Sequence, residues 1–515
     1  MKIKELLGLF ILIFLFSSIS QAQELEKSFF VRKINISGNS VISKEAFSLL
    51  LKDYEDKNLN LSDLERLTSL ITAEYKRQGY ILANAYLPGQ EIIDGIVEIC
   101  VSEGKIGEIK IQGKHRYYSD EFILGYFKPL LNKVYNQKNI ERSLLLLNEY
   151  PKLKVSTLLQ PGKTPGTTDI IVMAENIFPI ELSLDYDNFG SKYVSRDRFG
   201  ATLDISNLLK EGAILSLRGL SGIEPNELLF GRASYEIPLN NFGSKLSLYY
   251  CQGDFDVGRE LEVLNIGGRL KSYGISIKHP FLKTIKQSLI FGLSLNAKNT
   301  KQYLLSQVSS YDRIRSIEAN LSYETIQISS RSSLSLSITQ GLGEDFLDAM
   351  DNDSPYSSRY GADNRFTKFN LNLMHIQRIF PSLFLLLKGS GQFATDSLVA
   401  SEQFYLGGAN TVRGYSLGEI SGDMGYSLTG EFRISPLKDK EIMQIALFVD
   451  TGYAEVKNPV VGQKKDESLT GAGAGLRFNL PFEINIRFDV GFPVDPSETS
   501  DGKDEVYYIQ VMKKF

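Results

Sequence analysis

The sequence predicts two small α+β domains followed by a 16-stranded antiparallel transmembrane β-barrel. Three observations support this prediction. The N-terminal third contains one order of strands and helices twice, hydrophobicity alternates with period two from Ile180 onward, and 16 segments share that period. An even strand number is typical of a single-chain outer-membrane barrel. Many segments also reach the roughly 9–11 residues that a tilted strand needs to cross a bilayer.

The first 22 residues are expected to be a secretory signal peptide. Lys2 and Lys4 precede an apolar stretch over 6–16, and Ser20-Gln21-Ala22 offers small residues at the two cleavage positions. The apolar stretch is shorter than the roughly 20 residues of a membrane-spanning helix, so a retained anchor helix is the less favoured alternative. The signal predicts export from the cytoplasm.

Composition narrows the class of protein. Of the 515 residues, 43% are hydrophobic and 23% are charged, as in an ordinary folded protein. A net charge of −4 without a basic tract argues against nucleic acid as a partner. The two cysteines, Cys100 and Cys251, fall in different predicted domains and are interpreted as small packing residues.

Residues 23–104 are predicted to form the first α+β domain. Its longer helix is expected to begin with a capping box, in which Ser62 and Glu65 accept hydrogen bonds from each other's backbone N–H, and to end near Gly79. Four apolar residues of this helix share one face and should be buried: Leu64, Leu67, Ile71 and Tyr75. The expected order is strand 30–36, helix 43–51, the helix from 62, and strands 81–87 and 96–101.

Residues 105–178 are predicted to repeat this β-α-α-β-β order. Pro151 should end the second helix, and the Pro- and Gly-rich stretch 161–166 should form a turn between the last two strands. The expected elements are strand 106–111, helices 120–127 and 137–149, and strands 155–160 and 168–174. The remaining residues, 179–515, are assigned to the barrel.

The barrel strands each offer one apolar and one polar face. In 484–491, Ile484, Ile486, Phe488 and Val490 alternate with Asn485, Arg487, Asp489 and Gly491. A soluble β-sandwich has the same alternation, but the strand number and lengths favour the barrel. Unpaired edges in lipid cost several kcal/mol for each backbone group, so the sheet should close around a polar lumen.

Glycines cluster in 404–418, between expected strands 11 and 12, where the chain must bend tightly or lie close to another backbone. On strand 441–451, Met443, Ile445, Leu447 and Val449 form the outer face, so Phe448 and Asp450 should point inward. The same count places Glu431 and Arg433 of the preceding strand in the lumen.

Several stretches resemble POTRA domains of two-partner secretion transporters of the hemolysin-activator and filamentous-hemagglutinin type: I-x-I-x-G-N (34–39), R-Q-G-Y (77–80), A-Y-L-P-x-Q (85–90), 94–104 and 159–169. The loop over about 395–424 resembles the inward-folded V-R-G-Y loop of the POTRA-and-barrel superfamily, with Val412, Arg413, Gly414 and Tyr415 as its motif. The resemblance implies that Arg413 pairs with Asp450 in Phe448-x-Asp450. An arginine fork and a carboxylate would then hold the loop in one geometry.

The resemblance also implies a function and partners. The barrel would conduct a large secreted exoprotein, hemolysin- or adhesin-like, which the POTRA domains bind unfolded in the periplasm. The barrel would lie in the outer membrane among lipid and lipopolysaccharide, and the C-terminal Phe515 resembles the signal read by the barrel assembly machinery. No cofactor is implied. A barrel-assembly factor shares the fold and is the alternative, but such proteins usually carry more POTRA units.

Family members often have a plug helix before the first POTRA domain, whereas about seven residues separate Ala22 from the strand at Phe30. Either the Arg413 loop alone blocks the lumen or the pore leaks more than its relatives. A passive porin would lack both the POTRA domains and the loop.

Enzymatic functions fit the sequence less well. Gly414-x-Ser416-x-Gly418 matches the serine-hydrolase elbow, but the last of three histidines, His375, precedes Ser416 and no base follows it. Lys163 and Thr164 suggest a phosphate loop, but Thr157 stands where that motif needs glycine. His115 and His279 have no metal-ligand spacing. The sequence therefore predicts no enzyme.

Overall fold

The computed structural model describes residues 28–515 except 226, 353, 438–441, 495–498 and 501. The predicted signal peptide, 1–22, lies outside the described residues. The chain forms two compact units. One comprises the described residues up to Lys110, Lys128–Ile140 and Thr157–Ile171; the other comprises Ile111–Phe127, Glu141–Ser156 and Val172–Phe515. The division between the units passes through the second α/β domain.

The first α/β domain is a three-stranded sheet with helices packed against it. The sheet has the order β2-β5-β4, with β2 and β5 parallel, and β1 pairs separately with β3. One strand was expected over 30–36, but β1 ends at Val31 because the backbone N–H groups of Arg32 and Lys33 turn to Gly95 O. The elements are β1 (Phe29–Val31), β2 (Lys33–Ser37), η1 (Lys44–Phe47), α2 (Ser48–Lys52), β3 (Lys57–Leu59), α3 (Leu61–Arg77), β4 (Asn84–Tyr86) and β5 (Ile96–Ser102).

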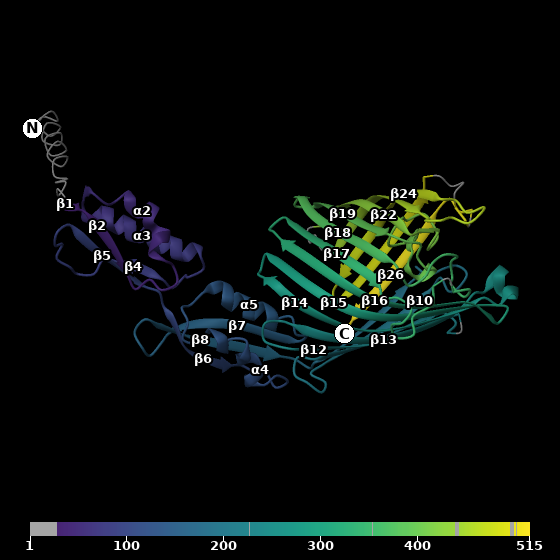
Figure 1. The fold of residues 1–515 in the computed structure, drawn as a ribbon, viewed down its shortest axis with the longest axis horizontal. Coiled ribbons are helices and arrows are strands. Elements are labelled where there is room, and N and C mark those ends of the chain that lie inside the picture. The colour runs from purple at the N-terminus through teal and green to yellow at the C-terminus, as the bar shows by residue number, and fades with distance from the viewer. Residues whose placement is uncertain (1–27, 226, 353, 438–441, 495–498, 501) are drawn as a thin grey trace, which may run out of the picture. The chain divides into compact units, whose positions relative to one another are not determined.

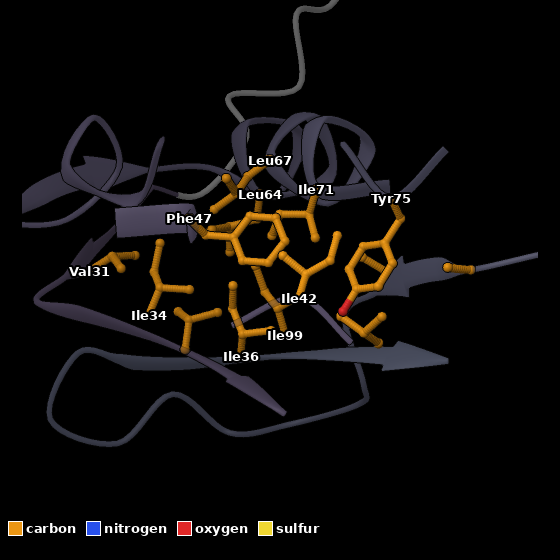
Figure 2. Close-up of a cluster of buried hydrophobic side chains, with 14 of the residues drawn as sticks. Val31, Ile34, Ile36, Ile42, Phe47, Leu64, Leu67, Ile71, Tyr75 and Ile99 are labelled. Carbon is orange, nitrogen blue, oxygen red and sulfur yellow. The ribbon is translucent and has the colours of Figure 1, made fainter. Parts of the chain in front are cut away.

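The core of this domain lies between α3 and the sheet. All four residues expected on the apolar face of α3 are buried, and Figure 2 shows them pointing toward side chains of β2 and β5 such as Ile36 and Ile99. The predicted cap was wrong by two residues. Asn60 Oδ1 accepts a hydrogen bond from Asp63 N at 2.8 Å, and Asp63 Oδ2 accepts one from Asn60 N at 3.1 Å. Asn60 and Asp63 have the same three-residue spacing as Ser62 and Glu65, and an asparagine caps as well as a serine.

A buried carboxylate fixes the turn after β2. Glu103 Oε1 accepts hydrogen bonds from Ser40 N at 2.6 Å, Val41 N at 3.0 Å and Tyr75 Oη at 2.9 Å, and Oε2 accepts one from Ser40 Oγ. Burial alone would raise the pKa of Glu103, but these bonds to the ionised form outweigh burial and lower the pKa. The turn therefore depends on an ionised Glu103.

The stability of this domain should fall in acid. A lowered pKa in the folded state gives stabilisation that is complete above the ordinary glutamate pKa of about 4.3 and is lost as pH falls toward the folded value. Hydrogen exchange of the α3 amides in the full chain, corrected for intrinsic rates, should therefore accelerate below that pH. Glu103→Gln should destabilise the domain by roughly 1–3 kcal/mol at neutral pH and flatten the pH dependence. An unchanged acid response in this variant would contradict the assignment.

The second α/β domain repeats the order of the first. Its strands form a sheet in the order β6-β8-β7. The repeat predicted from sequence is confirmed, and the elements of this second domain end within two residues of the predicted bounds. The first domain differs by the short strand β3 between its helices and by β4, which is shorter than the strand expected over 81–87. The elements are β6 (Lys105–Gln112), α4 (Asp120–Gly125), η2 (Lys128–Leu130), α5 (Gln137–Leu147), β7 (Leu153–Pro161) and β8 (Thr167–Asn176). Among the described residues, no helix is long and apolar enough to cross a membrane.

The C-terminal two-thirds forms a closed 16-stranded antiparallel barrel, as predicted (Figure 1). Pairing of β26 with β9 closes it, so every strand has two neighbours. The strands are β9 (Ile180–Asp187), β10 (Arg198–Ser206), β11 (Ile214–Gly222), β12 (Leu228–Pro238), β13 (Lys245–Asp256), β14 (Gly267–Lys283), β15 (Gln287–Leu304), β16 (Gln307–Ile326), β17 (Ser330–Gly341), β18 (Thr367–Phe380), β19 (Leu383–Ala394), β22 (Met424–Ile434), β23 (Met443–Glu455), β24 (Asp466–Leu480), β25 (Ile484–Pro493) and β26 (Val506–Lys514).

Side chains alternate across the barrel wall as the sequence predicts. On β15, Leu295 is 41% exposed on the outside, whereas Ser294 and Asn296 line a lumen cavity. One end of the barrel has short turns and the other carries long loops, including 342–366, 395–423 and 456–465. η3 (Arg259–Leu264) lies in another loop at that end. Phe515 is exposed, and its backbone N–H donates to Leu182 O at 2.8 Å.

Candidate functional site

The loop between β19 and β22 is anchored inside the barrel by a small apolar cluster. The loop contains η4 (Ala400–Glu402), followed by β20 (Phe404–Leu406), which pairs with β21 (Ile420–Gly422) in a hairpin. Leu406, Val412 and Tyr415 of the loop are buried against Ala454 and Leu469 of the wall. The tip of the loop therefore has a fixed position before any charge is considered.

Glycine is needed at the turn beside Arg413. Gly414 has φ +103°, in the region that favours glycine, and a Cβ there would lie 2.7 Å from the backbone carbon of Phe492. Tyr508 of β26 holds the same turn, because its Oη accepts from Gly414 N at 3.2 Å and donates to Tyr415 O at 2.9 Å. These contacts present the Arg413 side chain to β22–β25.

Arg413 is buried at the centre of an ion network. Its Nε and Nη2 donate to the two oxygens of Asp450 at 2.7 and 3.0 Å, a bidentate arrangement, and its backbone N–H donates to the same carboxylate at 3.1 Å. Nη1 donates to Glu431 Oε2 at 2.8 Å and to Asp489 Oδ2 at 3.4 Å. The guanidinium carbon lies 3.3 Å from the ring centroid of Phe448, so the planar group also stacks on an aromatic face.

Three further arginines complete the network. Arg433 Nε donates to Glu431 at 2.7 Å and Arg487 Nε donates to Asp489 at 2.7 Å. Arg477 bridges these two acids, at 2.5 Å to Asp489 and 3.3 Å to Glu431. Three buried carboxylates thus meet four guanidinium groups, so each buried charge has an opposite charge beside it.

The structure brings most of the sequence-predicted site residues together. Arg413, Asp450, Glu431, Arg433 and Phe448 are in direct contact through this network. Val412 and Tyr415 lie in the apolar anchor of the loop, and Gly414 forms its turn. Phe515 lies elsewhere, at the end of the chain.

Sequence reasoning missed Asp489, Arg477, Arg487 and Tyr508 as members of the site. The alternation in 484–491 does place Arg487 and Asp489 on the polar face. Alternation shows which face of a strand a side chain lies on. It does not show which residues of neighbouring strands lie side by side, or how far along the barrel axis the loop tip reaches. The register, which pairs Arg477 with Arg487 on adjacent strands, supplies the missing information.

A second ion cluster holds the same loop to another part of the wall. Glu402, in η4, accepts from Lys298 of β15 at 2.5 Å and from Lys368 of β18 at 2.6 Å. The loop is therefore bound both to β22–β25 and to β15 and β18. Cavities of about 980 and 560 Å³ remain beside the loop, lined by residues of β12–β19 and β22 that include many serine and asparagine side chains.

The histidines take no part in this site. His115 contacts Asp120 at 2.7 Å, His279 contacts Ser244 at 2.8 Å, and His375 contacts Ser332 at 2.7 Å. In the part of the chain that the structure describes, no three His, Cys, Asp or Glu residues are grouped to hold a metal ion. The ion pairs of this arrangement hold the loop in one position, and breaking them would release it.

Comparisons with known proteins agree with this architecture. A family model described as haemolysin secretion/activation protein ShlB/FhaC/HecB matches residues 166–478, and one described as POTRA domain, ShlB-type, matches residues 29–104. The chain is 27% identical over 492 residues to the heme/hemopexin transporter protein HuxB of Haemophilus influenzae, covering 93% of this chain and 85% of that protein.

A further relative is an outer-membrane transporter, and a solved structure shares the fold. The chain is 25% identical over 502 residues to the outer membrane transporter CdiB of Escherichia coli O6:K15:H31, covering 90% of this chain and 79% of that protein. The solved structure of CdiB from Escherichia coli superposes with a TM-score of 0.82 at 20% identity, covering 96% of this chain and 92% of that one. At this identity the structural match shows a shared fold.

Proposed function

The chain belongs to the haemolysin secretion/activation protein family ShlB/FhaC/HecB, and on that premise we propose that it exports one large, hemolysin- or adhesin-like partner exoprotein. It is an outer-membrane β-barrel transporter of two-partner secretion, with POTRA domains that lie in the periplasm in this family. The family is one of translocators. The proposal concerns the partner and the role of each part of the chain.

The observation that supports the proposal is the way the loop is held. Ion pairs, which can break, fix it inside a lumen that has polar walls. An extended polypeptide exposes many backbone N–H and C=O groups, and serine and asparagine side chains can bond such groups without selecting a sequence. In our proposal, the loop around Arg413 blocks this lumen at rest and shifts when the partner enters. Folding of the partner outside the cell gives the movement its direction.

The POTRA sheets are proposed to bind the unfolded partner in the periplasm. An extended segment can add a strand to an unpaired sheet edge, where main-chain hydrogen bonds give affinity with loose sequence demands. β6 and β7 form the two edges of the second POTRA sheet. Leu158 and Leu159 of β7 are exposed and could contact apolar side chains of the added strand. We also propose that the barrel assembly machinery inserts this chain and reads Phe515.

Deleting the gene should remove one large protein from the culture supernatant. The measurement is a quantitative comparison of supernatant and outer-membrane proteins between the deletion strain and the same strain carrying the gene. We expect loss of a single exoprotein, its restoration by the gene, and unchanged amounts of other barrel proteins. An intact supernatant with a joint fall of many barrel proteins would instead identify an assembly factor.

A further inference from the structure

One ion pair joins three loops at the end of the barrel that carries the long loops. Arg359 lies in loop 342–366, Asp423 directly precedes β22, and Lys457 follows β23. Arg359 Nη1 donates to Asp423 Oδ1 and, at 2.8 Å, to Leu398 O, while Nη2 donates to Lys457 O at 3.0 Å. The guanidinium group, which belongs to loop 342–366, therefore bonds loops 395–423 and 456–465 at once.

Asp423 completes the junction from the other side. Its side chain is fully buried, Oδ1 accepts from Leu398 N at 2.8 Å, and Oδ2 accepts from Lys457 N at 2.7 Å. Each member of the pair thus bonds the backbone of the same two residues. Removing one charge leaves the other buried without its counter-charge, which is far less favourable than the intact pair.

A packed apolar cluster lies at this junction. Leu398, whose backbone bonds both members of the ion pair, belongs to it. Loop 342–366 supplies Met350, Ala362 and Phe366, all almost completely buried. The other members come from β16, β19 and the loop after β19: Ile314, Ala394 and Val399. A close-packed apolar cluster excludes water and ions, so this part of the barrel mouth is closed.

The junction is distinct from the network around Arg413. Arg413 contacts side chains of the wall strands β22, β23 and β25, whereas the guanidinium group of Arg359 bonds Asp423 and the loop backbone at Leu398 and Lys457. Glu402, bound to Lys298 and Lys368, lies between them along the chain. The loop 395–423 is therefore held at three separate places.

We propose that the Arg359–Asp423 pair is an exit clasp that keeps the extracellular end of the barrel closed and must part for the exoprotein to leave. Long loops mark the extracellular end of outer-membrane barrels. When the pair separates, loops 342–366 and 456–465 lose their bonds to loop 395–423, and the apolar cluster at the junction opens. The inference rests on the proposed export function, but its closing role can be measured without any partner.

Ion conductance of the full chain in planar lipid bilayers tests the closing role. Asp423→Asn and, separately, Arg359→Gln should each raise the fraction of time spent open by about tenfold or more, because each loses a charge-assisted hydrogen-bond set. Glu467→Gln is the matched control. It removes an exposed ion pair between Glu467, at the start of β24, and Lys464, in the loop 456–465. Heat-modifiable migration in gels verifies that each barrel is folded.

A reversible crosslink tests the same role by closing the clasp again. The chain carries Arg359→Cys and Asp423→Cys after Cys100→Ser and Cys251→Ser have removed the native thiols. This chain should conduct like the single variants. A homobifunctional methanethiosulfonate should return conductance to the level of the unmodified protein, and a reductant should release it. The Arg359→Cys variant alone, treated in the same way, should stay open.

The outcomes separate the two proposals. Wild-type conductance in both single variants, or no effect of the crosslink, would overturn the clasp. If the crosslink closes the pore and also stops exoprotein release until a reductant is added, both proposals stand. If it closes the pore in a strain whose supernatant never depended on the chain, the clasp stands and the export proposal fails.

Discussion

Replacing Arg413 with alanine is expected to displace the inward-folded loop from its fixed position. Exoprotein secretion should then fall by about 100-fold, because the loosened loop obstructs the lumen and no longer shifts from one defined position when the partner enters. Asp450 is fully buried and receives three hydrogen bonds from Arg413. Removing one partner of a buried pair costs about 3–5 kcal/mol, which corresponds to a roughly 10²–10⁴-fold fall in the population of the loop in its bound position. Immunoblots of supernatant protein measure secretion, and hydrogen exchange of residues 411–416 measures the loop.

Two variants refine this prediction. Arg413→Lys keeps the charge but loses the planar fork, so it should rescue only a small part of secretion. Arg269→Ala is the control, because Arg269 and Asp254 form an exposed ion pair between β14 and β13. It should secrete nearly normally. Normal secretion by Arg413→Ala would refute a role for this network in transport.

Replacing Gly471 with alanine is expected to have a comparable effect while leaving every charge in place. Gly471 lies on β24 opposite Asp450, and a Cβ there would lie 1.8 Å from the backbone carbonyl oxygen of Arg413. The loop backbone would have to move, because a backbone oxygen cannot rotate away as a side chain can. Overpacking costs about 1–3 kcal/mol by itself, and the displaced Arg413 would also lose its contacts with Asp450.

The measurements are the unfolding midpoint of the barrel in detergent and the hydrogen exchange of the loop tip. Gly430→Ala is the matched control, because this glycine lies on β22, two strands away from β24, and an added Cβ would contact nothing within 4 Å. The control should match the wild type. Equal protection of the loop tip in both variants would contradict the close approach at Gly471.

Much of the fold followed from the period of hydrophobicity. The buried face of α3 and the outer faces of the strands follow from patterns within one element, and the structure confirms them. The capping box was predicted two residues too late because Asn60 and Ser62 are both favourable N-cap residues. The preferences of asparagine and serine for the N-cap position are almost equal. The break in the first strand depends on Gly95, more than 60 residues away, and local pattern carries no such information.

The candidate site divides in the same way. The sequence by itself determined that the chain is a two-sided barrel with a glycine-rich loop, and that Asp450, Glu431 and Arg433 face inward, because alternation is a property of a single strand. Only the tertiary structure decided that Asp489, Arg477 and Arg487 join Arg413, and that Arg359 meets Asp423. Those contacts depend on register between strands and on the path of loops across the lumen, which closure of the barrel fixes and no local sequence pattern encodes.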